Sequence, residues 1–188
     1  MANRVSLYVS EGPDIAHYSI DVEEATIMRR NTGSVPQVVQ YAWVHPTNRF
    51  LYAASSIGAK DSEHHLTAFS IGPDGGLSPN GEPRRLSQRP IHVTVDATGR
   101  YLLTAYNLPS SATVHRIDSD GRISDQVQQP KDLDAGFYAH QIRLFPSNRS
   151  AVLVARGTHR PNQSSDHPGS LKICSFEDGV LRNVDTVA

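Results

Sequence analysis

Two histidines stand near the start of short apolar segments, where a side chain could take part in acid–base chemistry. His92 lies in PIHVTV and His140 lies in AHQIRL. Imidazole titrates nearest to neutral pH, so either side chain could exchange a proton with a substrate or a water molecule. The alternative for each is a structural hydrogen bond to a neighbouring element. The sequence position alone leaves both interpretations open.

Further histidines could hold a metal ion if the fold gathered them. His64 and His65 are adjacent, and the segment THRPNQSSDHPG (158–169) carries two more histidines and an aspartate. Their spacing fits no compact ligand motif, and both stretches read as long surface loops between strands. We therefore expect no metal site. Cys174, in the apolar segment SLKICSF, is expected to be a small buried residue.

The overall composition gives few hints of a macromolecular partner. The 188 residues carry a formal net charge of -1, which gives no electrostatic reason to expect nucleic acid or an anionic membrane. We expect no signal peptide, because the N-terminal residues lack a basic segment followed by an apolar one, and no apolar run approaches the length of a membrane span. The single cysteine excludes a disulfide framework within the chain and favours a reducing, cytoplasmic compartment.

A repeat organises the chain. Each copy consists of an apolar segment, a four-residue polar turn that ends in arginine, and a second apolar segment. The three copies are VQYAWVHPTNRFLYAASS from Val39, PIHVTVDATGRYLLTAYN from Pro90 and AHQIRLFPSNRSAVLVARG from Ala139. The turn arginines are Arg49, Arg100 and Arg149, so the periods are 51 and 49 residues. Self-similarity at this period is typical of a repeat architecture.

Each copy continues in the same way, with a third apolar segment, a turn that contains Asp-Gly, and a shorter closing segment. The third segments are LTAFSI (66–71), ATVHRI (112–117) and SLKICSF (170–176). A partial copy opens the chain with RVSLYVS (4–10), DIAHYSID (14–21) and ATIMRRNTG (25–33). The expected repeat units are therefore residues 1–36, 37–86, 87–135 and 136–188.

Four antiparallel strands in about 50 residues predict an all-β fold, the blade of a β-propeller. A lone four-stranded sheet cannot bury both faces, so neighbouring blades must cover each other. The alternative is a β-sandwich with accidental internal similarity. The chain holds about three and a half blades, fewer than a closed ring, so we expect the N-terminal part of a longer propeller or a half-ring that needs a partner. Open strand edges would then favour self-association or poor solubility.

Two of these segments resemble a known family. PIHVTVDATGRYLLTAYN resembles a pattern in which Pro-x-His opens an inner strand and DxxGRYLL follows. YAHQIRLFPSNRSAVLV, from Tyr138, resembles a segment that contains His-Ala-His. The family is that of the seven-bladed propeller lactonases, which includes bacterial 6-phosphogluconolactonases and fungal carboxymuconate cycloisomerases. The resemblance covers essentially the whole chain.

The resemblance implies a seven-bladed propeller of four-stranded antiparallel blades, of which three and a half to four are present. It implies a lactonase that hydrolyses a small sugar-acid or related lactone at the channel mouth, without a metal or organic cofactor. A lactonizing cycloisomerase is one alternative, and a non-catalytic propeller that binds a partner or small molecule is another. In the family an arginine from a Gly-Pro-Arg-His segment and a glutamate, both from later blades, complete the site, and this chain has no such segment.

The residues themselves, together with the resemblance for His140, suggest particular roles. His140 stands at a family site position and is the candidate general base. The candidate substrate-binding residues are His92, Tyr138, Arg156 and Asn107, each of which could instead be structural. Gln141 is expected to be structural, because alternation along a strand turns it away from the face of His140. Trp43 and Tyr106 are expected to pack between blades.

Two departures from the family pattern concern the site itself. Tyr138 replaces the first histidine of the His-x-His pair, and Ala155-Arg156-Gly157 stands where members often have Asp-Leu-Gly. A channel-side carboxylate is therefore missing at this position, which leaves the identity of the substrate open.

Overall fold

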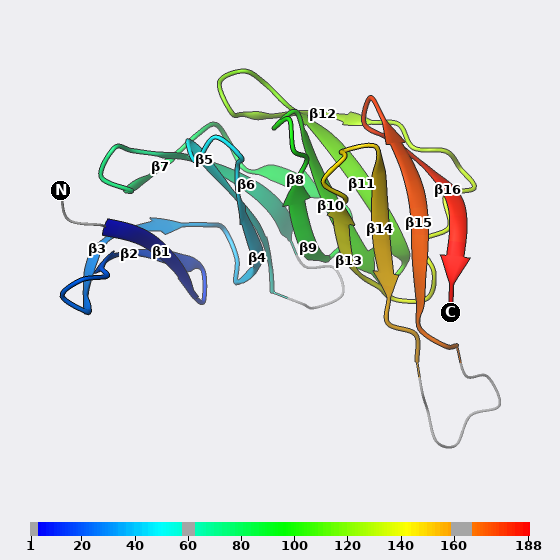
Figure 1. Cartoon of the computed structure of the whole chain (residues 1–188), viewed down its shortest axis with the longest axis horizontal. Coiled ribbons are helices and arrows are strands. Elements are labelled where there is room, and N and C mark those ends of the chain that lie inside the picture. Colours follow the sequence, from blue (N-terminus) through cyan, green and yellow to red (C-terminus); the bar gives the residue numbers. More distant parts are fainter. Residues whose placement is uncertain (1–3, 58–62, 159–166) are drawn as a thin grey trace.

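The computed structural model describes residues 4–57, 63–158 and 167–188. In these ranges the chain folds into antiparallel β-sheets that follow one another along an arc from the N-terminal to the C-terminal end (Figure 1). The expected all-β propeller of antiparallel blades is confirmed. The described ranges contain no helix of the length and apolarity that a membrane crossing needs.

The strands alternate with short turns along the whole chain. Their bounds are β1 Arg4–Glu11, β2 Asp14–Asp21, β3 Thr26–Ser34, β4 Val39–Val44, β5 Phe50–Ser56, β6 His64–Ile71, β7 Leu77–Pro79, β8 Arg84–Leu86, β9 Pro90–Val95, β10 Tyr101–Asn107, β11 Ser110–Ile117, β12 Ile123–Val127, β13 Ala139–Leu144, β14 Ser150–Ala155, β15 Ser170–Glu177 and β16 Val180–Val187.

Four sheets result from the pairing of these strands. The first contains β1, β2 and β3, and the third and fourth each contain four strands in chain order, β9 to β12 and β13 to β16. In the second sheet the closing segment is broken into β7 and β8, and both pair with β6. The inner strands β4, β9 and β13 lie side by side along the arc, with β9 between the other two.

The four-residue turns between the first two strands of each repeat share one backbone feature. Their third residues, Asn48, Gly99 and Asn148, have φ values of 56°, 74° and 58°. Asparagine and glycine tolerate this left-handed conformation best, which explains the residue types of the repeat. The turns also join neighbouring sheets, because His45 Nε2 lies 3.0 Å from the carbonyl oxygen of Gly99, and Asn148 Nδ2 donates to Asp96 over 2.9 Å.

The glycine of the later Asp-Gly turn packs against the preceding sheet. Gly121 has a φ of 83° and lies against the ring of Phe50, and Gly179 has a φ of 84° and lies against the ring of Tyr101. The hydroxyl of Tyr52 also donates to the carbonyl oxygen of Gly121 over 2.9 Å. At both sites a Cβ atom would overlap the aromatic ring, so these glycines are required for the sheets to approach.

Apolar clusters fill the spaces between consecutive sheets. The clusters between the first and second, second and third, and third and fourth sheets contain, among others, Leu51 with Phe69, Tyr52 with Leu102, and Leu103 with Leu153. All six side chains are almost completely buried. The second and third sheets thus bury both faces, one against each neighbouring sheet, as the repeat predicts.

The glycine contacts give a stability prediction. Gly121→Ala should lower the free energy of unfolding by about 2–4 kcal/mol, because it adds a clash with Phe50 to the cost of a positive φ. Gly12→Ala is the matched control, since Gly12 has a φ of 66° but no atom within 4 Å of the added Cβ. Urea unfolding of both variants measures the difference, and equal losses would contradict the importance of the contact between the sheets.

Candidate functional site

The heads of the three inner strands share a β-bulge. The register of β4 against β5 skips Gln40, that of β9 against β10 skips Ile91, and that of β13 against β14 skips His140. Each skipped residue is the second of its strand. A bulge leaves one residue outside the ladder and changes the direction of the side chains around it. The three inner strands therefore deviate from regular alternation at the same position.

These bulges build one cavity. It has a volume of about 420 Å³, and six of its seven lining residues are the skipped residue and its successor in each strand. The lining residues are Gln40, Tyr41, Arg89, Ile91, His92, His140 and Gln141. The expectation that Gln141 faces away from His140 was wrong. The bulge at His140 breaks the alternation, so both side chains line the same cavity.

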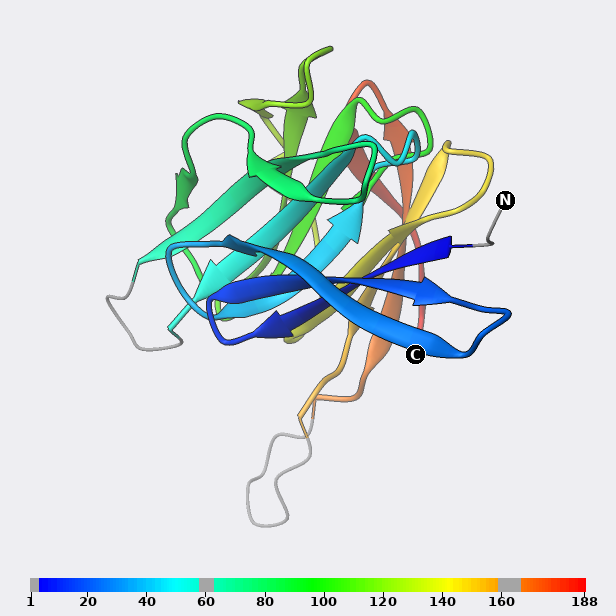
Figure 2. The same cartoon turned by 90° about the vertical axis from the view of Figure 1, so that its left-hand side faces the viewer.

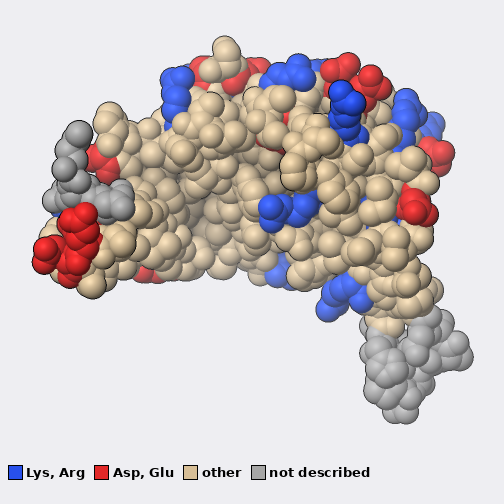
Figure 3. All heavy atoms as spheres, in the orientation of Figure 1, with Lys and Arg blue, Asp and Glu red and all other residues tan. Residues whose placement is uncertain are grey.

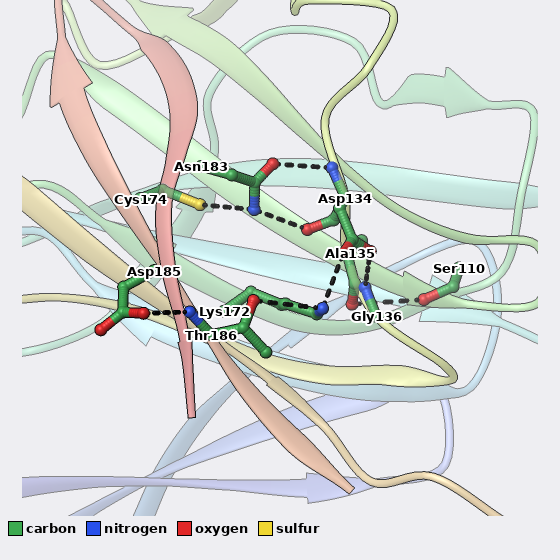
Figure 4. A network of polar contacts seen from close by, with 9 residues as sticks. All are labelled: Ser110, Asp134, Ala135, Gly136, Lys172, Cys174, Asn183, Asp185 and Thr186. Carbon is green, nitrogen blue, oxygen red and sulfur yellow. Dashed lines mark hydrogen bonds and ion pairs between the residues drawn. The ribbon is translucent and has the colours of Figure 1, made fainter. Parts of the chain in front are cut away.

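Polar contacts fix the segment that leads into β13 (Figure 4). Lys172 Nζ lies 2.6 Å from Asp134 Oδ2, and Asn183 accepts from the backbone N–H of Asp134 over 2.7 Å. Lys172 lowers the pKa of Asp134. The backbone N–H of Ala139, directly before His140, donates to Ser110 Oγ of the neighbouring sheet over 2.8 Å. The head of β13, and with it His140, is thereby held by contacts with both the third and the fourth sheet.

His92 is buried in the wall of the cavity, with 3% of its surface exposed. Its ring centroid lies 4.2 Å from that of Tyr41, and its Nε2 lies 3.5 Å from Gln141 Nε2. Burial, and to a lesser degree the positive charges of Arg143 and His140, lowers the pKa of His92 to about 4. His92 is therefore neutral at pH 7 and can offer one ring nitrogen as donor and the other as acceptor.

His140 has a different environment, since its side chain is exposed at the bulge. Although both histidines are close to the start of an inner strand, His140 matches Ile91 in register, and His92 matches Gln141. The two imidazoles therefore come from different positions of the repeat and meet in one cavity. An accessible imidazole beside a buried neutral one suits proton transfer by the first and hydrogen bonding by the second.

The cavity lining carries positive but no negative charge. Arg89 is among the seven lining residues, which include no aspartate or glutamate. In Figure 3 the middle of the visible face carries Lys and Arg side chains without Asp or Glu directly beside them. Such a lining favours an uncharged or anionic molecule over a cation.

The other three predicted binding residues lie outside the cavity lining. Tyr138 precedes β13 with a φ of 58°, and the guanidinium carbon of Arg156 lies 5.1 Å from the centre of its ring. Asn107 is the half-buried last residue of β10 and pairs with Ser110. The structure thus brings together His92 and His140 and, separately, Tyr138 and Arg156. Sequence reasoning missed Gln40, Tyr41 and Arg89. Gln40 and Tyr41 could have been found by aligning the repeats, because they match Ile91 with His92 and His140 with Gln141. Arg89, directly before β9, carried no such signal.

Several other expectations concern residues away from this cavity. His64 and His65 were expected in a surface loop, but they begin β6, and His64 is buried with its Nδ1 2.9 Å from Ser56 Oγ. Among the described residues no three His, Cys, Asp or Glu side chains are placed to hold a metal ion. Residues 159–166 of the histidine-containing segment lie outside the described residues. Cys174 is buried, and burial raises the pKa of its thiol to about 11.

The two aromatic residues expected to pack do so. Trp43 borders the cluster between the second and third sheets, and its ring centroid lies 6.1 Å from that of His92. Tyr106 belongs to the same cluster, and its hydroxyl lies 2.9 Å from Thr113 Oγ1.

Consecutive antiparallel sheets around an inner row of strands define an open β-propeller with a candidate site at the heads of its inner strands. The family model described as "Lactonase, 7-bladed beta-propeller" matches residues 4–160. The chain belongs to this family of seven-bladed propeller lactonases, as its segments indicated.

Individual relatives support the same grouping. The 6-phosphogluconolactonase of Yersinia enterocolitica is 29% identical over 126 residues, which cover 67% of this chain and 34% of the relative. The enzyme of the same name from Xenorhabdus nematophila is 26% identical over 136 residues, 72% of this chain and 38% of the relative. The chain thus matches about a third of the length of these curated relatives.

Solved structures show the same fold. A protein from Lactobacillus plantarum superposes with a TM-score of 0.71 at 11% identity, over 98% of this chain and 52% of the other. The periplasmic gluconolactonase of Pseudomonas aeruginosa superposes with a TM-score of 0.63 at 18% identity, over 96% of this chain and 67% of the other. At these identities the likeness concerns the fold alone.

The burial of His92 predicts a pH dependence of stability. Its pKa is about 4 in the folded chain against 6.5 when exposed, so the unfolded state binds more protons between these values. The stabilisation is complete above pH 6.5 and is lost as the pH falls towards 4, by about 3 kcal/mol in all. His92→Gln should remove this part of the slope in urea unfolding across that range. An unchanged slope would contradict the burial of a neutral imidazole.

Proposed function

We propose that the cavity at the heads of β4, β9 and β13 belongs to a lactone-hydrolysing site for a small sugar-acid or related lactone. The observation that carries this proposal is the pairing of an accessible imidazole, His140, with a buried neutral one, His92, in the wall of one cavity. Membership of the lactonase family and the names of the curated relatives support it.

The proposed reaction uses a water molecule and one general base. His140 takes a proton from water while the water oxygen attacks the lactone carbonyl carbon. The ring C–O bond then breaks, and the proton passes from the imidazolium to the leaving alkoxide, so the products are a hydroxyl group and a carboxylic acid that ionises. His92, with Gln141 beside its Nε2, holds the substrate by hydrogen bonds in a fixed orientation. In this scheme no step needs a metal ion or an organic cofactor.

Tyr138, Arg156 and Asn107 remain proposed substrate-binding residues, although they are not among the residues that line the cavity. Tyr138 and Arg156 contact each other next to the head of β13, and this position supports a role in holding a part of the substrate that extends beyond the cavity. We also propose a cytoplasmic location, supported by a single cysteine that is free and buried.

His140→Ala tests the proposed chemistry. It should lower kcat/KM for the lactone by roughly 100- to 10,000-fold, since it removes a general base. The substrates to be tested are 6-phosphogluconolactone, gluconolactone and a muconate-derived lactone. Their hydrolysis is measured by pH-stat titration of the released acid. His65→Ala, outside the cavity lining, is the control and should keep the activity, and EDTA should not change the rate. Activity that survives His140→Ala, or none on any lactone, would overturn the proposal.

We further propose that this chain self-associates through its first sheet. Alternate residues of β1 are exposed on one face, with Val5 at 48%, Leu7 at 39% and Val9 at 36%. This sheet lies at the end of the row, and no further described sheet covers it in Figure 2. β1 pairs with β2 along one edge, and its other edge offers backbone hydrogen-bonding groups to a second copy of the chain.

Sedimentation velocity at several concentrations measures the association. The chain should sediment as a concentration-dependent mixture of species, and Leu7→Lys combined with Val9→Lys should shift it to monomer, because the charges oppose burial of this face. Val22→Lys, at an exposed position between β2 and β3, is the control and should leave the distribution unchanged. A monodisperse monomer for the unaltered chain would refute the association.

A further inference from the structure

Arg89 is held at the cavity by a neutral partner. Its Nε and one terminal nitrogen donate to Gln40 Oε1 over 3.2 and 2.8 Å. Gln40 is itself oriented, because its Nε2 donates to the carbonyl oxygens of Val38 and Ser56 over 3.2 and 3.1 Å. The amide therefore points its oxygen at Arg89 and fixes the direction of the guanidinium without neutralising its charge.

Arg143 is a second cation on the same side of the inner strands. Its guanidinium carbon lies 4.5 Å from the centre of the Trp43 ring, a distance at which the indole face attracts a cation. Trp43 is in turn flanked by the rings of Tyr41 and His92, at centroid distances of 6.4 and 6.1 Å. The charge of Arg143 acts at the cavity wall, since it contributes to the lowered pKa of His92.

Neither arginine is paired with an acid in the described part of the chain, whereas three other cations are. Arg29 pairs with Glu11, Arg122 with Asp120, and Lys172 with Asp134. Two oriented guanidinium groups beside a cavity without carboxylates form an electropositive site. Planar guanidinium groups bind the oxygens of phosphates and carboxylates through paired hydrogen bonds.

We propose that Arg89 and Arg143 together bind an anionic oxygen group, a phosphate or a carboxylate, of the molecule that enters the cavity. Gln40 and Trp43 are positioning residues that hold the two guanidinium groups in place. The proposal rests on the proposed function in that the bound molecule is the substrate or product of the same site. It assigns the anion to Arg89 and Arg143 rather than to Arg156, which does not line the cavity.

Trp43 provides the measurement, because it is the single tryptophan of the chain and lies under Arg143. Titration of the chain with 6-phosphogluconate should change tryptophan fluorescence in a saturable way. Arg89→Gln and Arg143→Gln should each weaken this binding by about 10- to 100-fold, as expected for loss of a charged hydrogen-bonding partner. Arg143→Lys should restore little, since it keeps the charge but loses the planar group.

Matched titrations separate the possible outcomes. Inorganic phosphate that competes where gluconate does not identifies a phosphate site, and the reverse identifies a carboxylate site. Arg122→Gln is the control, since Arg122 pairs with Asp120. This variant should bind the anion as tightly as the unaltered chain. His140→Ala should keep anion binding even where hydrolysis is lost, so failure of the lactonase proposal and failure of this one are distinguishable. If Arg89→Gln and Arg143→Gln bound the anion as tightly as the unaltered chain, or if none of the three anions bound, the proposal would be overturned.

Discussion

Every sheet of this chain can bury its two faces only against the sheets on either side of it. Leu102 and Leu103 show this directly, since they are adjacent in β10 and belong to the clusters on opposite sides of the third sheet. The fold is thus a row of mutually dependent layers rather than one central core. The position of each inner strand is set by both neighbours, so the heads of β4, β9 and β13 stand at a fixed separation.

The first sheet departs from the repeat at a position where the second and third sheets carry an aromatic residue. Ser6 stands opposite Ser19 in the first sheet, where the later sheets place Phe50 opposite Ser70 and Tyr101 opposite Arg116. The aromatic rings at those two positions pack against a turn glycine of the next sheet. Ser6 itself has no ring, and the imidazole of His17, whose Nε2 lies 3.0 Å from Ser6 Oγ, packs against the turn glycine Gly75 instead. A cavity of about 430 Å³ lies beside Ser6.

The candidate site uses a different kind of departure, one of the backbone. Three bulges at equivalent positions turn two successive side chains of each inner strand towards the same cavity, which doubles the number of groups that each strand head contributes. Burial then differentiates the histidines, since His92 is kept neutral by desolvation and His140 remains exposed. The proposed roles of the two side chains follow from this difference in environment.

The sequence by itself determined the class of fold and the order of the strands. A period near 50 residues, with Asn or Gly at the positive φ position of each turn, restricts the chain to repeated antiparallel sheets. It also indicated His92 and His140, because polar side chains at the start of apolar strands are conspicuous. The division into four units and the roles of individual site residues stay predictions.

Only the tertiary structure decided which side chains share the cavity. Regular alternation predicted that Gln141 would face away from His140, and it does not, because a bulge depends on pairing with the neighbouring strand and leaves no clear mark in the residue types. The contact of Arg89 with Gln40 joins the residue before β9 to the second sheet, and that of Arg143 with Trp43 joins the fourth sheet to the second. Such contacts are set by how the sheets pack together, which a repeat pattern within one strand does not contain.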